Sequence, residues 1–181
     1  MAAKIVWGIT GSGDRIAEVF EVMAELAGHK ELAITSVLSR AAVKVVNWYK
    51  LKEKLDGISK KVFVEEDANT PFIVGPLQTG EFDCLLVAPA TANTVAKVVN
   101  GIADTIITNA ISQTNKTNTP IYILPVDQKK GTTMTVLPGG KKLELTMRDV
   151  DIENTNKLKT MHGIITLANP GDIKSVLNKY L

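Results

Sequence analysis

The chain has 181 residues, of which 45% are hydrophobic and 22% are charged, and its formal net charge is +2. This length fits one domain of ordinary size, so we take 1–181 as a single domain. The balanced charge excludes a polyanion-binding tail, and we expect no nucleic-acid partner. One cysteine and two histidines exclude a disulfide scaffold and a Cys-based or histidine-rich metal site within one chain. No apolar stretch approaches the ~20 residues of a membrane span, so we expect a cytoplasmic protein without membrane contact.

Strand-like and helix-like segments alternate over the first two-thirds of the chain. Short apolar runs predict strands at 4–7, 32–38, 62–64, 84–88 and 121–124. Apolar residues at helical spacing predict helices at 16–26, 41–55, 91–99 and 103–111. We assign no structure to the Pro- and Gly-containing stretch before the fourth strand, and we expect the acidic run 65–67 to be a solvated loop.

The pattern of apolar and polar residues changes in the last third of the chain. Alternating residues at 133–136 and 142–145 flank Leu137-Pro138-Gly139-Gly140, which predicts a hairpin. A helix at 152–161, a short strand at 164–167 and a closing helix at 170–180 complete the chain.

The order of these segments predicts the fold class. Alternating strands and helices favour an α/β protein: a Rossmann-like or flavodoxin-like three-layer αβα sandwich with a central parallel sheet and a C-terminal β-hairpin extension. The run at 84–88 is almost purely apolar, as expected for a central strand covered on both faces, and Pro89 is expected to end it.

The turn after the first strand has the chemistry of an anion site. Thr10, Gly11, Ser12 and Gly13 place backbone N–H groups and hydroxyls at the start of a helix, where a phosphate could bind. The alternative is a tight strand–helix turn whose small residues serve packing alone.

The next segments indicate which phosphate would bind. A dinucleotide fingerprint needs a third glycine where this chain has Ile16, and an acid near the end of the second strand. That strand ends in Ser39 and Arg40 instead, which suit a terminal phosphate monoester. The pattern favours a mononucleotide such as FMN over NAD, although Arg40 could also suit an NADP 2′-phosphate or be an ordinary solvated side chain.

A second loop follows the fourth strand and contains Ala90, Thr91, Asn93 and Thr94. Small residues and side-chain donors stand there at a helix start. In a doubly wound sheet, ligands bind at the carboxyl ends of strands where the strand order reverses. If the first and fourth strands are neighbours, this loop faces the glycine-rich turn across one crevice.

At these positions the sequence resembles the homo-oligomeric flavin-containing Cys decarboxylase superfamily. The resemblance rests on Gly8-Ile9-Thr10-Gly11-Ser12, on Ser39 with Ala42, and on Pro89-Ala90-Thr91-Ala92-Asn93-Thr94 running on to Asn100-Gly101-Ile102-Ala103-Asp104. The opening 6–14 and the segment 151–155 are most similar to the archaeal flavoproteins, the archaeoflavoproteins and the dihydromethanopterin reductases.

The resemblance implies an FMN cofactor and an assignment of residues to it. Thr10, Gly11, Ser12 and Ser39 would contact the phosphate. The isoalloxazine ring would lie along Ala90, Thr91, Asn93 and Thr94, with the Pro125 turn nearby. The family also implies a homo-oligomer with the flavin near a subunit interface.

The sequence departs from the decarboxylase members at two places. The stretch 73–83 lacks the histidine that they carry before the fourth strand, and 125–128 reads Pro-Val-Asp-Gln where they carry a substrate clamp. We therefore expect an FMN-dependent electron-transfer oxidoreductase that takes electrons from a carrier such as ferredoxin and reduces a protein or pterin acceptor. The alternatives are a decarboxylase or flavin prenyltransferase of the same superfamily, or a nucleotide-binding module without turnover.

Two lysine pairs bracket the predicted hairpin, Lys129-Lys130 and Lys141-Lys142. Such pairs are usually solvated loop charge. The functional hypothesis is a docking surface for an acidic carrier such as ferredoxin, because complementary charge raises encounter rates.

Overall fold

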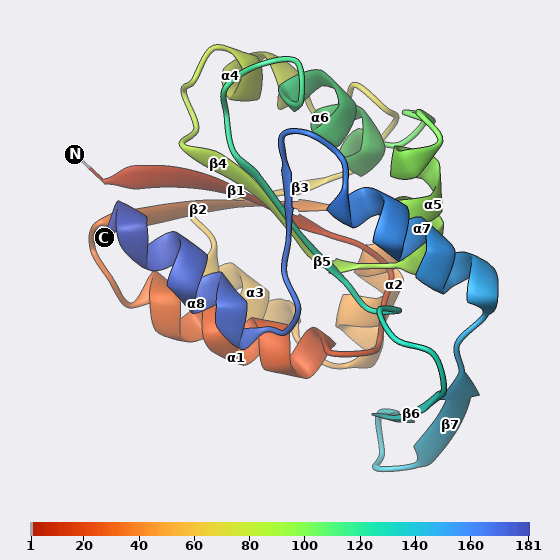
Figure 1. Ribbon diagram of the computed structural model, residues 1–181. Helices are drawn as coiled ribbons and strands as arrows, with labels where there is room; N and C mark the ends of the chain where they lie inside the picture. Colours follow the sequence, from red (N-terminus) through yellow and green to blue (C-terminus); the bar gives the residue numbers. More distant parts are fainter. Residues whose placement is uncertain (1) are drawn as a thin grey trace.

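A computed structural model describes residues 2–181 and has a parallel sheet at its centre (Figure 1). The six strands run in the order β3-β2-β1-β4-β5-β8. Their bounds are β1 Ala3–Ile9, β2 Leu32–Leu38, β3 Lys61–Val64, β4 Cys84–Ala90, β5 Ile121–Pro125 and β8 Ile164–Thr166. All pairings in this sheet are parallel. The predicted α/β class and the central parallel sheet are confirmed.

Burial follows the position of each strand in the sheet. Every residue of β4 and of β5 is buried, whereas both edge strands, β3 and β8, have exposed positions. Central strands of a parallel sheet are covered on both faces, which is why their sequences read as continuous apolar runs.

Helices cover both faces of the sheet (Figure 1). One apolar core packs α1, α2, α3 and α8 against one face, and a second packs α4, α5, α6 and α7 against the other. The bounds are α1 Ile16–Ala27, α2 Arg40–Trp48, α3 Lys52–Ile58, α4 Val74–Gln78, α5 Ala92–Val99, α6 Ile106–Thr114, α7 Asp149–Lys159 and α8 Gly171–Leu177, with a 3₁₀ turn at Asn178–Tyr180. In the described range, 2–181, none of these helices has the length and apolarity to cross a bilayer.

Two local predictions are wrong, and a stretch to which we assigned no structure is partly helical. The helix at 41–55 is two helices, α2 and α3, because Lys50 takes a left-handed conformation (φ 55°) and turns the chain between them. Strand β4 continues through Pro89 to Ala90, with an irregular register between Val87 and Ala90. The stretch left unassigned contains the short helix α4.

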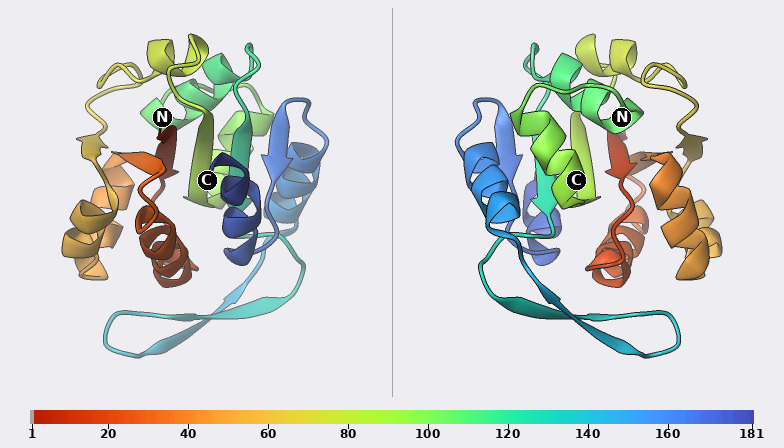
Figure 2. Two further views of the ribbon diagram at one scale, coloured as in Figure 1. Left: turned by 90° about the vertical axis from the view of Figure 1, so that its left-hand side faces the viewer. Right: turned by 90° about the vertical axis from the view of Figure 1, so that its right-hand side faces the viewer.

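The predicted hairpin is confirmed as an antiparallel ribbon of β6 (Thr132–Val136) and β7 (Lys142–Thr146). It projects beyond the body of the molecule (Figure 2). All residues of β7 are exposed, and Tyr49 attaches the ribbon to the body by donating a hydrogen bond from its hydroxyl to the Val136 carbonyl (3.2 Å).

Candidate functional site

The strand order reverses between β1 and β4, which lie side by side at the centre of the sheet. From β1 the chain proceeds outward through β2 and β3, then returns to the other side of β1 as β4. The loops after β1 and β4 therefore diverge from neighbouring strand ends. This is the topological position at which open α/β sheets bind ligands.

Thr10 joins these two loops. Its hydroxyl donates to the Pro89 carbonyl at 2.7 Å and accepts from the Thr91 N–H at 2.9 Å, and its own N–H bonds the same carbonyl at 3.3 Å. Thr10 is 2% exposed, so these bonds are shielded from water. The hydroxyl has one proton, and Pro89 uses it. Thr10 thus fixes the spacing of the two loops.

A cavity of about 400 Å³ lies beside this junction, and we call it the switch-point cavity. It is lined by Thr10, Gly11, Ser39, Arg40, Ala41, Glu65, Thr91, Asn93, Thr94, Lys97, Thr105 and Ile107. Its volume is within the range of small-molecule sites, about 300–1,000 Å³.

Three helices begin at the wall of the switch-point cavity. Each starts with a hydroxyl residue whose oxygen accepts a backbone N–H: Ser39 from Ala42 (3.1 Å), Thr91 from Thr94 (3.2 Å) and Thr105 from Thr108 (3.2 Å). These residues cap α2, α5 and α6. Because the positive ends of three helix dipoles meet there, the cavity attracts an anion.

Glu65 lies among these positive ends. Its carboxylate accepts the Arg40 N–H at 2.9 Å and the Ile106 N–H at 3.0 Å, so one side chain spans the starts of α2 and α6. The cavity wall also carries Lys97, which pairs with Asp104 at 2.8 Å and lowers the pKa of that carboxyl. The backbone N–H groups of Arg40 and Ile106, at the starts of α2 and α6, thus already donate to the carboxylate of Glu65.

The glycine-rich turn approaches α2 closely. A Cβ on Gly11 would lie 2.6 Å from the Ala41 Cβ, a distance that real side chains do not adopt. The Gly11 N–H makes no hydrogen bond within residues 2–181. A glycine is therefore needed where the turn meets the helix start, and its amide remains available to a ligand.

The structure brings together six of the nine residues expected from the sequence to bind the cofactor. Thr10, Gly11, Ser39, Thr91, Asn93 and Thr94 line the switch-point cavity. The other three do not line it. Ser12 is buried, and its hydroxyl donates a hydrogen bond to the Asp14 carbonyl (3.2 Å). Ala90 and Pro125 are buried and pair with each other between β4 and β5.

A second cavity, of about 450 Å³, lies on the other side of the glycine-rich turn, between Asp14, Val126 and the base of the ribbon. Burial raises the pKa of Asp14, and burial together with the charges of Asp151 and Asp14 raises the pKa of Asp127. Asp151 is itself buried in an ion pair with Arg148. The turn that the resemblance places near the ring thus carries a carboxyl that holds its proton more readily than usual.

Sequence reasoning missed Glu65 and Thr105. Glu65 was expected in a solvated loop, but it is half-buried against two helix starts. No local pattern predicts this, because its partners are far away in the chain. Thr105 and Thr108 form a reciprocal capping pair, but the third position carries Thr in place of the usual Glu or Gln, so the sequence signal for this helix start is weak.

The reactive residue types that the sequence does contain lie elsewhere. Cys84 begins β4, and His29 and His162 precede β2 and β8, so all three are at the amino edge of the sheet, opposite the crevice. Burial raises the pKa of the Cys84 thiol to about 12, which leaves it an inert thiol. Within residues 2–181, no histidine or cysteine is available to chemistry at the carboxyl edge.

The chain belongs to the Flavoprotein family, whose model matches residues 1–178. It is 52% identical over 178 residues to an uncharacterized protein of Methanocaldococcus jannaschii, covering 98% of this chain and 96% of that protein. It is 33% identical to a dihydromethanopterin reductase (acceptor) of the same organism, covering 97% and 96% of the two chains. The resemblance drawn from the sequence is confirmed.

Among solved structures, DmrB of Burkholderia xenovorans is similar over 98% of this chain and 94% of its own, with 28% identity and a TM-score of 0.82. That structure contains FMN and is described as a cubic protein cage for redox transfer.

Proposed function

We propose that this protein binds FMN and acts as an electron-transfer oxidoreductase, accepting electrons from a carrier and reducing a protein or pterin acceptor. The observation that carries the proposal is the meeting of three helix starts and a glycine turn in one cavity at the strand-order reversal. Such a cavity fits a phosphate monoester with an organic group attached. Similarity to the dihydromethanopterin reductase and to DmrB supports the redox role.

The residues present suit the phosphate of FMN. Gly11 would offer its N–H and Ser39 its hydroxyl, while the positive ends of α2, α5 and α6 offset the charge. Asn93 and Thr94, at the start of α5, would lie along the flavin. When bound, the isoalloxazine supplies the atoms that accept and release electrons.

Asp127 suits a proton-holding role beside such a cofactor. It lies in the turn after β5, and burial raises its pKa, so its carboxyl holds a proton to higher pH than an exposed aspartate does. A redox centre whose charge changes on reduction works best with a nearby group that can take up or release a proton.

A decarboxylase or prenyltransferase of the same superfamily is the alternative. The location of His29 and His162 at the amino edge argues against it, because no imidazole is available where the cofactor would bind. Release of carbon dioxide from a peptidyl or pantothenoyl cysteine would favour this alternative over ours.

Anaerobic reduction with a panel of donors tests the proposal. We expect the purified protein to be yellow, to bleach with dithionite, and to be reduced by ferredoxin but not by NAD(P)H. A colourless preparation that fails to bind added FMN would exclude the proposal.

We further propose that the carrier is an acidic protein such as ferredoxin, docking at the lysines of the ribbon. Lys129 and Lys130 are at its base and Lys141 and Lys142 at its tip. Lys130 pairs with Asp149 at 2.8 Å, with both side chains exposed. Replacing all four lysines with glutamine is expected to slow reduction by ferredoxin about tenfold at low salt and to flatten its salt dependence. An unchanged rate and salt profile would exclude this docking surface.

We also propose a homo-oligomer with the flavin near a subunit interface. The cage described for DmrB supports this, as do Met134 and Val136 of the ribbon, each 53% exposed. Light scattering on the purified protein measures the assembly, and a monomeric mass would contradict the proposal.

A further inference from the structure

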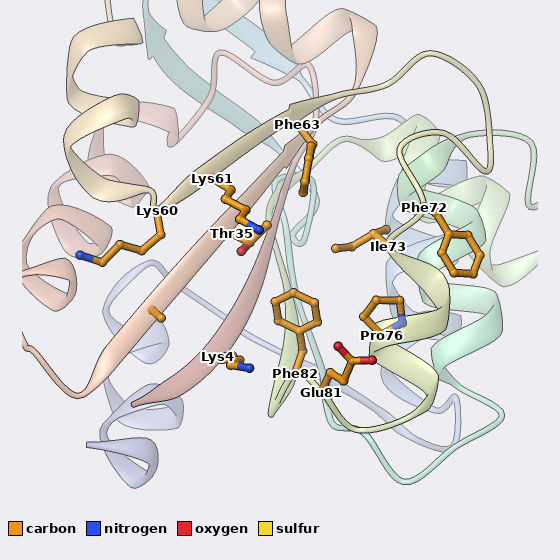
Figure 3. A pocket seen from close by; sticks show the side chains of 11 residues that line it. Lys4, Thr35, Lys60, Lys61, Phe63, Phe72, Ile73, Pro76, Glu81 and Phe82 are labelled. Carbon is orange, nitrogen blue, oxygen red and sulfur yellow. The ribbon is translucent and has the colours of Figure 1, made fainter. Parts of the chain in front are cut away.

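A separate concave site lies on the sheet face that carries α4 (Figure 3). We call it the sheet-face cavity; its volume is about 400 Å³. It is bounded by the first residues of β1, β2 and β3, by α4 and by the segment leading into β4. It shares no lining residue with the switch-point cavity.

The walls of the sheet-face cavity are largely aromatic and aliphatic. Phe63 from β3, Ile73 from the start of α4 and Phe82 from the segment before β4 point toward the same open space (Figure 3). Phe72 lies at the edge, 72% exposed, with its ring over Gly75. A concave surface of this composition and size is typical of a site that takes an apolar or planar organic group.

The cations of this cavity are on its sheet side, while one carboxylate, Glu81, lines the opposite side next to Phe82 (Figure 3). Side chains alternate along a strand, and this places Lys4, Thr35, Lys61 and Phe63 on the same face of the sheet. Figure 3 shows Lys61 next to Thr35, whereas Lys60 also lines the cavity but directs its ammonium group away from it. Lys4 and Lys61 form no ion pair within residues 2–181.

Thr35 adds a hydroxyl to this polar wall. Its side chain lines the cavity, and the residue is 8% exposed. A hydroxyl at this position can donate or accept a hydrogen bond with a polar atom of a bound molecule.

We propose that the sheet-face cavity binds a small amphipathic anion, such as an aromatic carboxylate or sulfonate. The apolar body would lie between Phe63, Ile73 and Phe82, and the acidic group would face Lys61 and Lys4. Thr35 would hydrogen-bond a polar atom at the junction of the two parts. The concave shape and the cations at one end favour a small molecule over a flat protein surface.

A pair of fluorescent probes tests this proposal on the full chain with saturating FMN present. 8-Anilinonaphthalene-1-sulfonate carries an acidic group, and N-phenyl-1-naphthylamine has the same aromatic skeleton without it. We expect one anionic probe to bind per chain, about tenfold more tightly than the neutral probe, because only the anion can pair with lysine.

Matched variants locate the binding. Lys61→Met should weaken the anionic probe about five- to tenfold and leave the neutral probe within twofold, whereas the neighbouring control Lys60→Met should change neither by more than twofold. Phe82→Ser should weaken both probes, with thermal unfolding confirming that the variant is folded. The proposal is overturned if the wild type binds neither probe, if both bind equally, or if Lys60→Met and Lys61→Met have the same effect.

Discussion

Thr10 sets the geometry of the candidate site, but its hydroxyl proton is not free to bind a ligand. Its hydroxyl hydrogen is directed to the Pro89 carbonyl, and one lone pair receives the Thr91 N–H. The donors left for an anion are then backbone amides such as Gly11 and the capped helix starts. We infer that Thr10 is a positioning residue for the two loops that flank the switch-point cavity.

Replacing Thr10 with valine keeps its shape and removes both side-chain bonds. We expect Thr10→Val to lower the free energy of unfolding by ~2 kcal/mol, because the Thr91 N–H loses its acceptor and the Pro89 carbonyl keeps only the longer bond from the Thr10 backbone N–H (3.3 Å). For a chain of this size that is about 4–8 °C in Tm. FMN affinity should fall about tenfold as the loops separate. Thermal unfolding and calorimetric titration measure the two effects.

Thr10→Ser is the matched control, because it retains the hydroxyl and loses only a methyl group. It should retain FMN affinity to within about threefold. Equal losses in the serine and valine variants would mean that packing of the methyl group, and not the two hydrogen bonds, holds the loops together.

Helix starts are the functional units at the next scale. α2, α5 and α6 come from three separate parts of the chain, and the strand order alone brings their first turns to one cavity. In the structure, the Glu65 carboxylate takes the Arg40 and Ile106 amides. A phosphate in the switch-point cavity would therefore meet a like charge beside its own donors.

The isosteric change Glu65→Gln tests whether this carboxylate opposes a bound phosphate. We expect FMN affinity to rise about five- to tenfold, corresponding to ~1–1.4 kcal/mol, since the repulsion is removed. The gain should shrink at high salt, which screens charges. Without FMN, the variant should be slightly less stable, because an amide oxygen can replace only one of the two accepted bonds.

Glu66→Gln is the neighbouring control, since Glu66 is exposed and its side chain does not line the cavity. It should leave FMN affinity unchanged. Weaker FMN binding in Glu65→Gln would show instead that the carboxylate holds the cofactor.

The elements predicted from the sequence were those whose signals are local. Strand β2 has the predicted bounds because an apolar run marks both of its ends. The break between α2 and α3 had no such signal. There, the Lys50 N–H bonds Asn47 and the Leu51 N–H bonds Val46, an ending that usually places glycine where this chain has lysine.

The candidate site likewise has parts that local sequence signals predict and parts that depend on contacts between distant residues. The crevice loops were predictable because small residues and helix caps follow apolar strands in the sequence. Strand β4 passes through Pro89 because that residue's carbonyl is held by Thr10, 79 positions earlier in the chain. Glu65 likewise depends on partners 25 and 41 positions away. Such contacts exist only after the sheet has formed.

The two ends of the parallel sheet, where the strands have their carboxyl and amino ends, carry different kinds of functional groups. The carboxyl edge carries the helix starts and the glycine turn, together with Asp14 and Asp127, whose pKa values are raised by burial. The amino edge carries the buried Cys84 and the lysines of the sheet-face cavity. Carboxyls that are buried near a binding crevice cost folding free energy when they ionise, as is common at functional sites.

This cost gives a prediction about stability and pH. The folded-state pKa of Asp127 is above its unfolded value of about 3.9, so between the two values the native protein binds more protons than the unfolded chain. Stability from this group is therefore lost as pH rises through that interval. Asp127→Asn cannot ionise, so we expect it to raise Tm at neutral pH and to lose that advantage as pH falls below about 3.9.

Asp67 provides a control of opposite sign. Backbone N–H bonds from Asn69 and Thr70 lower its pKa, so its stabilising effect is present above its unfolded pKa and lost as pH falls through the folded value. Asp67→Asn should therefore lower Tm at neutral pH. Melting curves of both variants and the wild type between pH 3 and pH 8 separate the two cases. If Asp127→Asn were destabilising at neutral pH, the ionised Asp127 would be paired in the folded protein and could not serve as a proton-holding group beside a flavin.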